Sequence, residues 1–411
     1  MIRFARLRGS ARRGFEAAGD LAGRARLLAT DRVLESRHDG LRVRGREESF
    51  DVVLFFSAEP AQLYQATMWL GPLEELARHV RVAVLCRQAG HAIRLASMTG
   101  LPVRMSRRAE ECNGWLTRSG VALVVYVNQN TQNFQTLRLP RPAHAHLSHG
   151  ESEKVSMVSN QLKAYDLVFT AGPAARHRIL ENLFDFDPAA FVDVGRPQVD
   201  VHDAVRHLPS SDRVTVLYAP TWEGDSPAMA YGSVASQGEA IAAAVLQSSG
   251  HRLVYRPHPQ TGRVSAAARR ADRAIRTRIE RAAAADPAAG HRVDTSSVWG
   301  WQLDEADQCI CDVSAVAFDW LATGKPILLT AAKGDARSVG PTTARLPRLS
   351  VDETPRVLEL LSSETDLQHR QALAALVEHH FGDTTPGSSM RRFVQACTDA
   401  VTHRRSQWGE G

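Results

Sequence analysis

From residue 49 onward, short apolar stretches alternate with longer stretches of helical character. The apolar stretches have the length of strands, as in DVVLFFS at residues 51–57 and VALVVYV at residues 121–127. Their apolar residues are consecutive instead of alternating with polar ones, which is typical of parallel strands buried on both faces. The repeated strand and helix units therefore predict an α/β protein with doubly wound parallel sheets.

The pattern is interrupted once, by a polar stretch at residues 202–212, and then restarts with a strand at residues 214–219. Residues 354–403 form a tail that is predicted to be helical in three pieces. Two successive sheets predict two Rossmann-like domains that face a cleft. In such sheets ligands bind at the carboxyl ends of the strands, so functional residues should follow strands.

Composition excludes several classes of protein. The chain has 411 residues, of which 44% are hydrophobic and 23% charged, so it is neither disordered nor collagen-like. It contains no apolar run near the roughly 20 residues that span a bilayer. Five cysteines occur without a CxxC pair or a zinc spacing, which favours a reduced, cytoplasmic protein.

The net charge of +5 is unevenly distributed. Residues 1–46 contain twelve arginines and five acidic residues, so the other 365 residues carry a net charge of −2. This basic N-terminal arm predicts contact with an anionic membrane surface, which would place the protein on the inner face of the cell membrane. A solvated leader is the alternative. The slightly acidic body disfavours nucleic-acid binding, and no nucleic-acid partner is expected.

The sequence has neither GxGxxG after its first strand nor GxxxxGK[ST], so classical dinucleotide and P-loop sites lack support. A different motif, Arg256-Pro257-His258-Pro259, follows a predicted strand directly. Its two prolines keep the loop extended, which fixes Arg256 and His258 where they could contact phosphate oxygens. A rigid surface turn is the alternative interpretation.

A second group follows the strand at residues 308–312. Asp312 ends that strand and Ser314 occupies a helix N-cap position, so the N–H groups of Ala315 and the next residue could bind a pyrophosphate. Ordinary helix capping explains Ser314 equally well. Ordinary helix-end chemistry likewise explains Gly324-Lys325-Pro326.

Two further groups carry candidate chemistry. Pro220, Thr221 and Trp222 follow the first strand of the second half, where a packed tryptophan is the alternative. In His144-Ala145-His146-Leu147-Ser148-His149-Gly150, the histidine spacing matches the HxHxDH zinc motif of metallo-β-lactamase-fold hydrolases. Ser148 replaces the aspartate of that motif, so we interpret His149 as a single catalytic or binding histidine.

Together these sites resemble the CDP-glycerol glycerophosphotransferase family, which contains teichoic-acid primases and polymerases with a GT-B fold. The similarity covers about residues 145–330 and keeps the order of the family's motifs. Two of its motifs are unchanged, Ala-Pro-Thr-Trp at residues 219–222 and Arg-Pro-His-Pro at residues 256–259. The others are altered, namely His149-Gly150-Glu151, Gly195-Arg196-Pro197-Gln198-Val199-Asp200, Asp312-Val313-Ser314-Ala315 with Phe318-Asp319, and the Gly-Lys-Pro at residues 324–326. The family's threonine and Pro-Leu-Lys after His-Gly are here Glu151 and Ser152-Glu153-Lys154.

The resemblance implies a GT-B-like architecture with an acceptor domain at residues 47–203 and a nucleotide-donor domain at residues 204–385, followed by a C-terminal helix and tail at residues 386–411. It implies transfer of glycerol phosphate, or a similar alditol phosphate, from a CDP-linked donor to a hydroxyl of a cell-envelope polymer or lipid-linked precursor, with release of CMP. His149 and His258 are the catalytic candidates. The substrate-binding candidates are Gly150, Pro220, Thr221, Trp222, Arg256, Asp312, Ser314, Ala315 and Asp319.

In this interpretation His149 is the general base and the cationic groups stabilise charge on the phosphates. No metal or other cofactor is expected. A GT-B glycosyltransferase that uses a nucleotide sugar in capsule or cell-wall synthesis is the main alternative. A metal-dependent hydrolase and a basic nucleic-acid-binding protein are less favoured alternatives.

Overall fold

The computed structural model describes residues 29–45, 47–151, 158–201, 205–224, 230–296, 299–330, 340 and 342–409. Most of the predicted basic arm, residues 1–28 and Arg46, lies outside the described residues. So does Ser152-Glu153-Lys154, which departs from the family's Pro-Leu-Lys. Within the described part of the chain, no helix is both long enough and apolar enough to cross a membrane.

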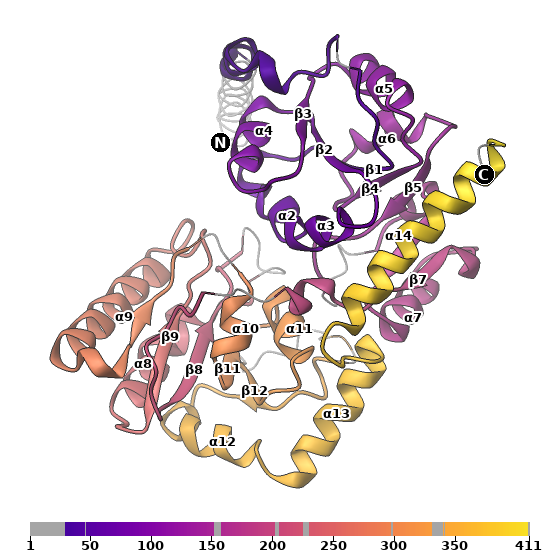
Figure 1. Cartoon of the computed structure of the whole chain (residues 1–411). Helices are drawn as coiled ribbons and strands as arrows, with labels where there is room; N and C mark the ends of the chain where they lie inside the picture. Colours follow the sequence, from indigo (N-terminus) through magenta and orange to yellow (C-terminus); the bar gives the residue numbers. More distant parts are fainter. Residues whose placement is uncertain are drawn as a thin grey trace, which may run out of the picture. The chain divides into compact units, whose positions relative to one another are not determined.

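The first sheet has seven strands in the order β3-β2-β1-β4-β5-β6-β7 (Figure 1). They are β1 (Val52–Phe56), β2 (Val82–Cys86), β3 (Val103–Met105), β4 (Leu123–Tyr126), β5 (Ala143–His146), β6 (Leu167–Thr170) and β7 (Phe191–Asp193). The central strand β1 pairs in parallel with both β2 and β4. The connecting helices are α2 (Tyr64–Thr67), α3 (Leu70–Leu76), α4 (Ala89–Ala96), α5 (Ala109–Arg118), α6 (Asn133–Leu137) and α7 (Pro173–Asn182).

The second sheet has six strands in the order β10-β9-β8-β11-β12-β13. They are β8 (Val214–Ala219), β9 (His251–Tyr255), β10 (Arg292–Val293), β11 (Gln308–Cys311), β12 (Ile327–Thr330) and β13 (Arg348–Leu349). Its helices are α8 (Glu239–Leu246), α9 (Ala266–Ala285), α10 (Trp301–Glu305) and α11 (Ala315–Leu321), followed by α12 (Val357–Ser363), α13 (Leu367–Phe381) and α14 (Ser388–Gln407). The three last helices confirm the predicted helical tail.

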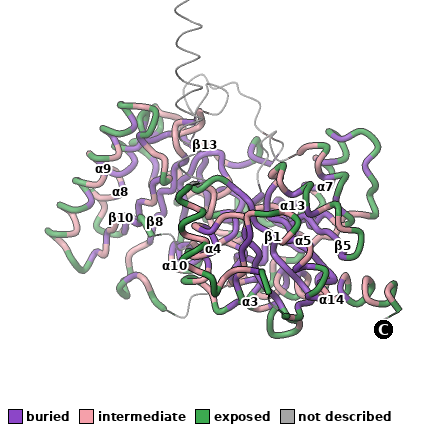
Figure 2. The backbone as a smooth tube through the Cα atoms, turned by 90° about the horizontal axis from the view of Figure 1, so that it is seen from above, coloured by how far each residue is buried: buried purple, intermediate pink, exposed green. Residues whose placement is uncertain are grey.

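The strands are buried on both faces, which explains their continuous apolar runs. In β8, Leu217 packs in a core with Trp320 of α11, whereas its neighbours Val216 and Tyr218 pack in another core with Ile275 of α9. Figure 2 shows buried backbone along the strands and exposed backbone on outer helices such as α9. The predicted doubly wound α/β fold is therefore confirmed.

By internal contacts, the described residues up to His146 form one compact unit together with those from Cys397 onward, and Leu147–Ala396 form a second. The boundary between these units lies between His146 and Leu147, before the loop that carries His149. The predicted boundary at residue 203 instead lies between the last strand of the first sheet and the first strand of the second. The domain boundaries stay a prediction. All five cysteines are buried and free.

Two local features of the structure are not evident from the sequence pattern. The helical stretch after β1 is divided into a 3-10 turn at Pro60–Gln62, α2 and α3. Pro72 lies in α3, and a proline ring excludes a continuous helix over the preceding turn.

The charge pattern also suggested an arm through residue 46, but residues 29–45 pack on the first unit. A helix there, described over residues 29–37, is joined to the rest of that unit through the Glu35–Arg107 ion pair at 2.7 Å.

Candidate functional site

The predicted donor-side residues meet at one edge of the second sheet. Arg256 and His258 follow β9, Thr221 and Trp222 follow β8, and Ser314 follows β11, and these three strands are adjacent in the sheet. Parallel strands end at the same edge, which we call the carboxyl edge. The structure therefore brings these candidates to one side of the fold, as their order along the chain predicts.

Asp312 is a buried residue that joins the loops of the carboxyl edge by hydrogen bonds. Its side chain is fully buried, and its Oδ2 atom accepts the N–H groups of Thr221 at 2.8 Å and Ser233 at 3.1 Å. Its Oδ1 atom accepts the hydroxyl of Thr330, at the end of β12. Burial raises the pKa of Asp312 to about 6, although these hydrogen bonds act to lower it. This arrangement fits a residue that holds the loops in place better than one that contacts a ligand.

Glu223 ends the candidate stretch that follows β8, and the sequence pattern gave it no role of its own. Its carboxylate accepts the N–H groups of Gly262, Val264 and Ser265 at 2.8–3.0 Å, and so joins the loop after β8 to the start of α9. Burial alone would raise the pKa of Glu223, but these N–H groups outweigh it and lower the pKa. Its position directly after the Ala-Pro-Thr-Trp motif is the sequence feature that could have identified it as part of the site.

The two candidates that follow β9 are held by neighbours. The ring of His258 stacks on Trp222 with 19° between the planes, and its Nδ1 atom accepts the N–H of Gln260 at 3.2 Å. Arg256 forms an ion pair with Asp294, which follows β10, and its guanidinium lies 5.3 Å from the ring centroid of Trp299. A phosphate at Arg256 would therefore share the guanidinium with Asp294.

Ser314 begins α11 in an extended conformation, but its side chain makes no capping hydrogen bond. Its Oγ atom is buried and has no partner among the described residues, so ordinary capping does not explain this serine. An added Cβ at Gly150 would lie 3.4 Å from the Cβ of Ala315. The His149-Gly150 loop thus adjoins the start of α11, and both belong to the second unit.

The loop that carries His149 has an unusual backbone. Ser148 has a φ of 61°, in the left-handed region that residues other than glycine and asparagine rarely adopt. Its hydroxyl donates to the carbonyl of Gly150 at 2.8 Å, which closes a tight turn after β5. Glu151 then forms a buried ion pair with Arg178 of α7. His149, which is half-buried, is therefore fixed by anchors on both sides.

The zinc interpretation of the three histidines does not fit the structure. The Nε2 atom of His144 lies 2.9 Å from the carbonyl of Leu139, and its Nδ1 atom lies 2.9 Å from the Tyr126 hydroxyl. Both ring nitrogens are thus used by protein groups, so His144 cannot ligate a metal without losing them. Among the described residues, no group of three or more His, Cys, Asp or Glu side chains has a metal-binding arrangement.

Two motif residues have roles in holding the fold. Asp319 is buried, forms an ion pair with Arg196 and accepts the indole N–H of Trp299 at 3.0 Å. Asp319 therefore holds Arg196 and Trp299 in position, and its carboxylate is not available to a ligand. The ammonium of Lys325 donates to the carbonyls of Leu303, Asp304 and Ala306 and caps the end of α10.

The sequence profile of the family described as CDP-glycerol:poly(glycerophosphate) glycerophosphotransferase matches residues 128–336. The chain belongs to this family. The profile covers β5 to β12, and thus all of the motifs discussed above. The membership confirms the predicted glycerophosphotransferase activity and the transferase class.

Solved structures show the GT-B fold. The wall teichoic acid polymerase TagF is 14% identical, with a TM-score of 0.56 over 86% of this chain and 89% of that chain. A putative UDP-N-acetylglucosamine 2-epimerase from Listeria monocytogenes is also 14% identical, with a TM-score of 0.57 over 86% of this chain and 97% of that chain. These likenesses confirm the predicted GT-B-like architecture. No curated protein matches the chain.

Proposed function

We propose that this glycerophosphotransferase binds CDP-glycerol, or a related CDP-alditol, at the carboxyl edge of the second sheet and transfers alditol phosphate to a hydroxyl of a cell-envelope polymer or lipid-linked precursor. The observation that carries the proposal is the convergence of Arg256, His258, Ser314 and the His149-Gly150 loop within one unit. The membrane-facing and cytoplasmic location expected from the basic arm is part of the same proposal.

In the proposed reaction the acceptor oxygen attacks the phosphorus that carries the alditol. The bond from that phosphorus to the CMP oxygen breaks, and CMP leaves with the electron pair. His149 removes the proton of the acceptor hydroxyl, for which a neutral imidazole is needed. Arg256, His258 and the Ser314 hydroxyl stabilise charge on the phosphate oxygens. Trp222 holds the His258 ring by stacking, and Pro220, Thr221, Gly150 and Ala315 form the backbone surface around them.

His149→Ala is expected to reduce turnover by about two to four orders of magnitude, as removal of a general base does, with little change in donor affinity. His258→Ala should weaken donor binding as well as turnover, because a phosphate contact serves ground and transition states. CMP release and calorimetric titration with CDP-glycerol measure the two effects.

A suitable control is His177→Ala on α7, because that side chain is 74% exposed and pairs only with Glu181 among the described residues. Wild-type turnover in a folded His149→Ala protein would contradict the proposed base. Release of UDP or GDP from a nucleotide sugar, without CMP release from CDP-glycerol, would favour the glycosyltransferase alternative.

A further inference from the structure

A cavity of about 360 Å³ lies in the first unit between α5 and α6. Figure 1 shows these two helices side by side, and they are in direct contact. We call this cavity the α5–α6 pocket. It is lined by Ala109, Glu110, Asn113, Gln135, Arg138 and Leu139.

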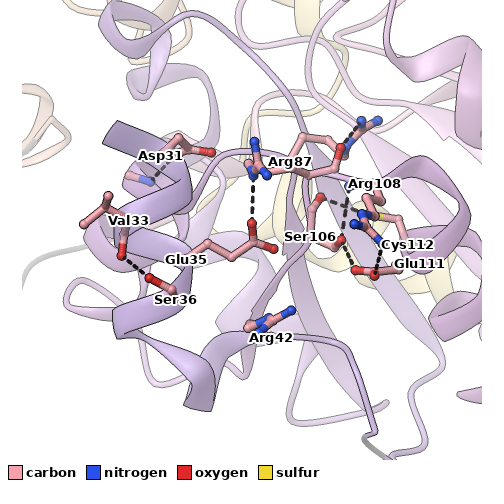
Figure 3. A network of polar contacts seen from close by, with 12 residues as sticks. Asp31, Val33, Glu35, Ser36, Arg42, Arg87, Ser106, Arg108, Glu111 and Cys112 are labelled. Atoms are coloured by element: carbon pink, nitrogen blue, oxygen red, sulfur yellow. Dashed lines mark hydrogen bonds and ion pairs between the residues drawn. The ribbon is translucent and has the colours of Figure 1, made fainter. Parts of the chain in front are cut away.

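The pocket contains both a carboxylate and a guanidinium. Within the described part of the chain, neither Glu110 nor Arg138 forms an ion pair or a side-chain hydrogen bond, whereas the neighbouring Glu111 accepts a hydrogen bond from Ser106 at 2.6 Å and pairs with Arg108 (Figure 3). Opposite charges that line one cavity without pairing suit a ligand that supplies an anion and a hydrogen-bond donor together.

The wall of the pocket is fixed by other contacts. Asn113 donates from Nδ2 to the carbonyl of Gln135 at 2.9 Å, and Arg87 donates to the Gln135 side-chain oxygen at 2.7 Å. These contacts hold the wall of the pocket in place without using Glu110 or Arg138.

We propose that the α5–α6 pocket binds one polyol-phosphate unit of the acceptor chain. The phosphate contacts Arg138, whose planar guanidinium suits two phosphate oxygens. The unit's hydroxyls donate to Glu110. That this ligand is part of the acceptor rests on the proposed function. That the pocket binds a polyol phosphate rests only on its lining residues.

Binding of sn-glycerol 3-phosphate to the full-length protein tests the site directly. Saturation-transfer NMR is used with sn-glycerol 3-phosphate, inorganic phosphate, glycerol and glycine as separate probes. Glycerol 3-phosphate should bind more tightly than phosphate or glycerol alone. Arg138→Ala should weaken it by about tenfold or more, as expected for loss of a hydrogen bond to a charged group. Glu110→Gln should weaken it less, because an amide oxygen can still accept.

Arg118→Ala is the matched control, because Arg118 is an exposed arginine at the end of α5 outside the pocket lining, and it should leave binding unchanged. An equal affinity in Arg138→Ala would overturn the site, and tighter binding of glycine would replace the ligand class with a zwitterion. In transfer assays, Arg138→Ala should raise KM for a polymeric acceptor and leave donor affinity unchanged. If glycerol 3-phosphate binds but no CMP-forming transfer occurs, the proposed function fails while the pocket stands.

Discussion

Asp312 shows how one buried carboxylate can set the geometry of a site without facing it. Three loops converge on its two oxygens, from the ends of β8 and β12 and from Ser233 before α8. Because the carboxylate is fully buried, its charged form is costly, and the raised pKa of about 6 reports this cost. Ionisation of Asp312 and the ordering of the loops that it holds are therefore coupled near neutral pH.

Stability should reflect this coupling. The pKa of Asp312 is about 6 when folded and 3.8 as the reference, so the folded state binds the proton more tightly. The proton therefore stabilises the fold below about pH 4, and this contribution is lost as pH rises through 6. Asp312→Asn removes the effect. The difference in unfolding free energy between variant and wild type should change by about 2 kcal/mol between pH 4 and pH 8, in favour of the variant at high pH.

Chemical denaturation of both proteins at several pH values measures this difference. The other titrating groups are shared by the two proteins, so they cancel in the comparison. A difference that does not vary with pH would show that the pKa of Asp312 is not raised.

At the scale of elements, the loop after β5 depends on its anchor to α7. Glu151 occupies the position of the family's threonine, and its ion pair with Arg178 is largely buried, with side-chain exposures of 8% and 16%. Removal of one partner leaves a buried charge without its counter-ion, which is strongly destabilising. The departure from the family motif therefore has a structural consequence that the sequence did not reveal.

Arg178→Leu should accordingly lower stability by about 3 kcal/mol or more and reduce turnover, because the His149 loop loses its support. The double variant Glu151→Thr with Arg178→Leu should recover much of both, since no charge is then left unpaired. Thermal unfolding and CMP release measure the two properties. A double variant no better than Arg178→Leu would argue against this anchor.

A second element-scale prediction concerns Lys325. Its ammonium caps three carbonyls at the end of α10, and burial lowers the pKa of this lysine. Lys325→Met should lower the unfolding temperature while leaving CDP-glycerol affinity within about twofold of wild type, because a cap acts on the helix end only. Calorimetry and thermal unfolding separate the two effects, and a large loss of affinity would instead indicate a phosphate contact.

At the scale of the whole molecule, the basic arm and the remainder of the chain differ in net charge, since the arm is positive and the remainder slightly negative. The described residues 29–45 pack on the first unit, where Asp31 accepts the N–H of Gly90 at 3.2 Å and Glu35 pairs with Arg107. Two acidic residues of the predicted arm thus fix its end to the fold. Residues 1–28 carry seven of its arginines and two of its acids.

Deletion of residues 1–28 should therefore abolish binding to vesicles of anionic lipid but leave transfer to a soluble acceptor largely intact. Binding of the full chain should fall as salt rises, since surplus arginine meets a screened surface. Vesicle co-sedimentation at low and high salt measures this. Salt-insensitive binding by the deleted protein would contradict a role for the arm.

The sequence by itself determined the architecture and the edge at which the candidates meet. Continuous apolar runs such as residues 121–127 identified buried parallel strands, because a strand covered on both faces has no polar alternation. Parallel strands end at one edge, so the motifs after β8, β9 and β11 had to converge. The unchanged motifs also indicated the family.

Only the tertiary structure decided what each side chain contacts. Asp312 and Asp319 read as substrate-binding candidates, but both are buried and hold backbone or side-chain partners far away in the sequence. Asp294, Trp299 and the α5–α6 pocket had no motif at all. The local sequence pattern determines the order of strands and loops. Burial and pairing of side chains arise only when segments that are distant in the sequence pack together, so the local pattern does not predict those contacts.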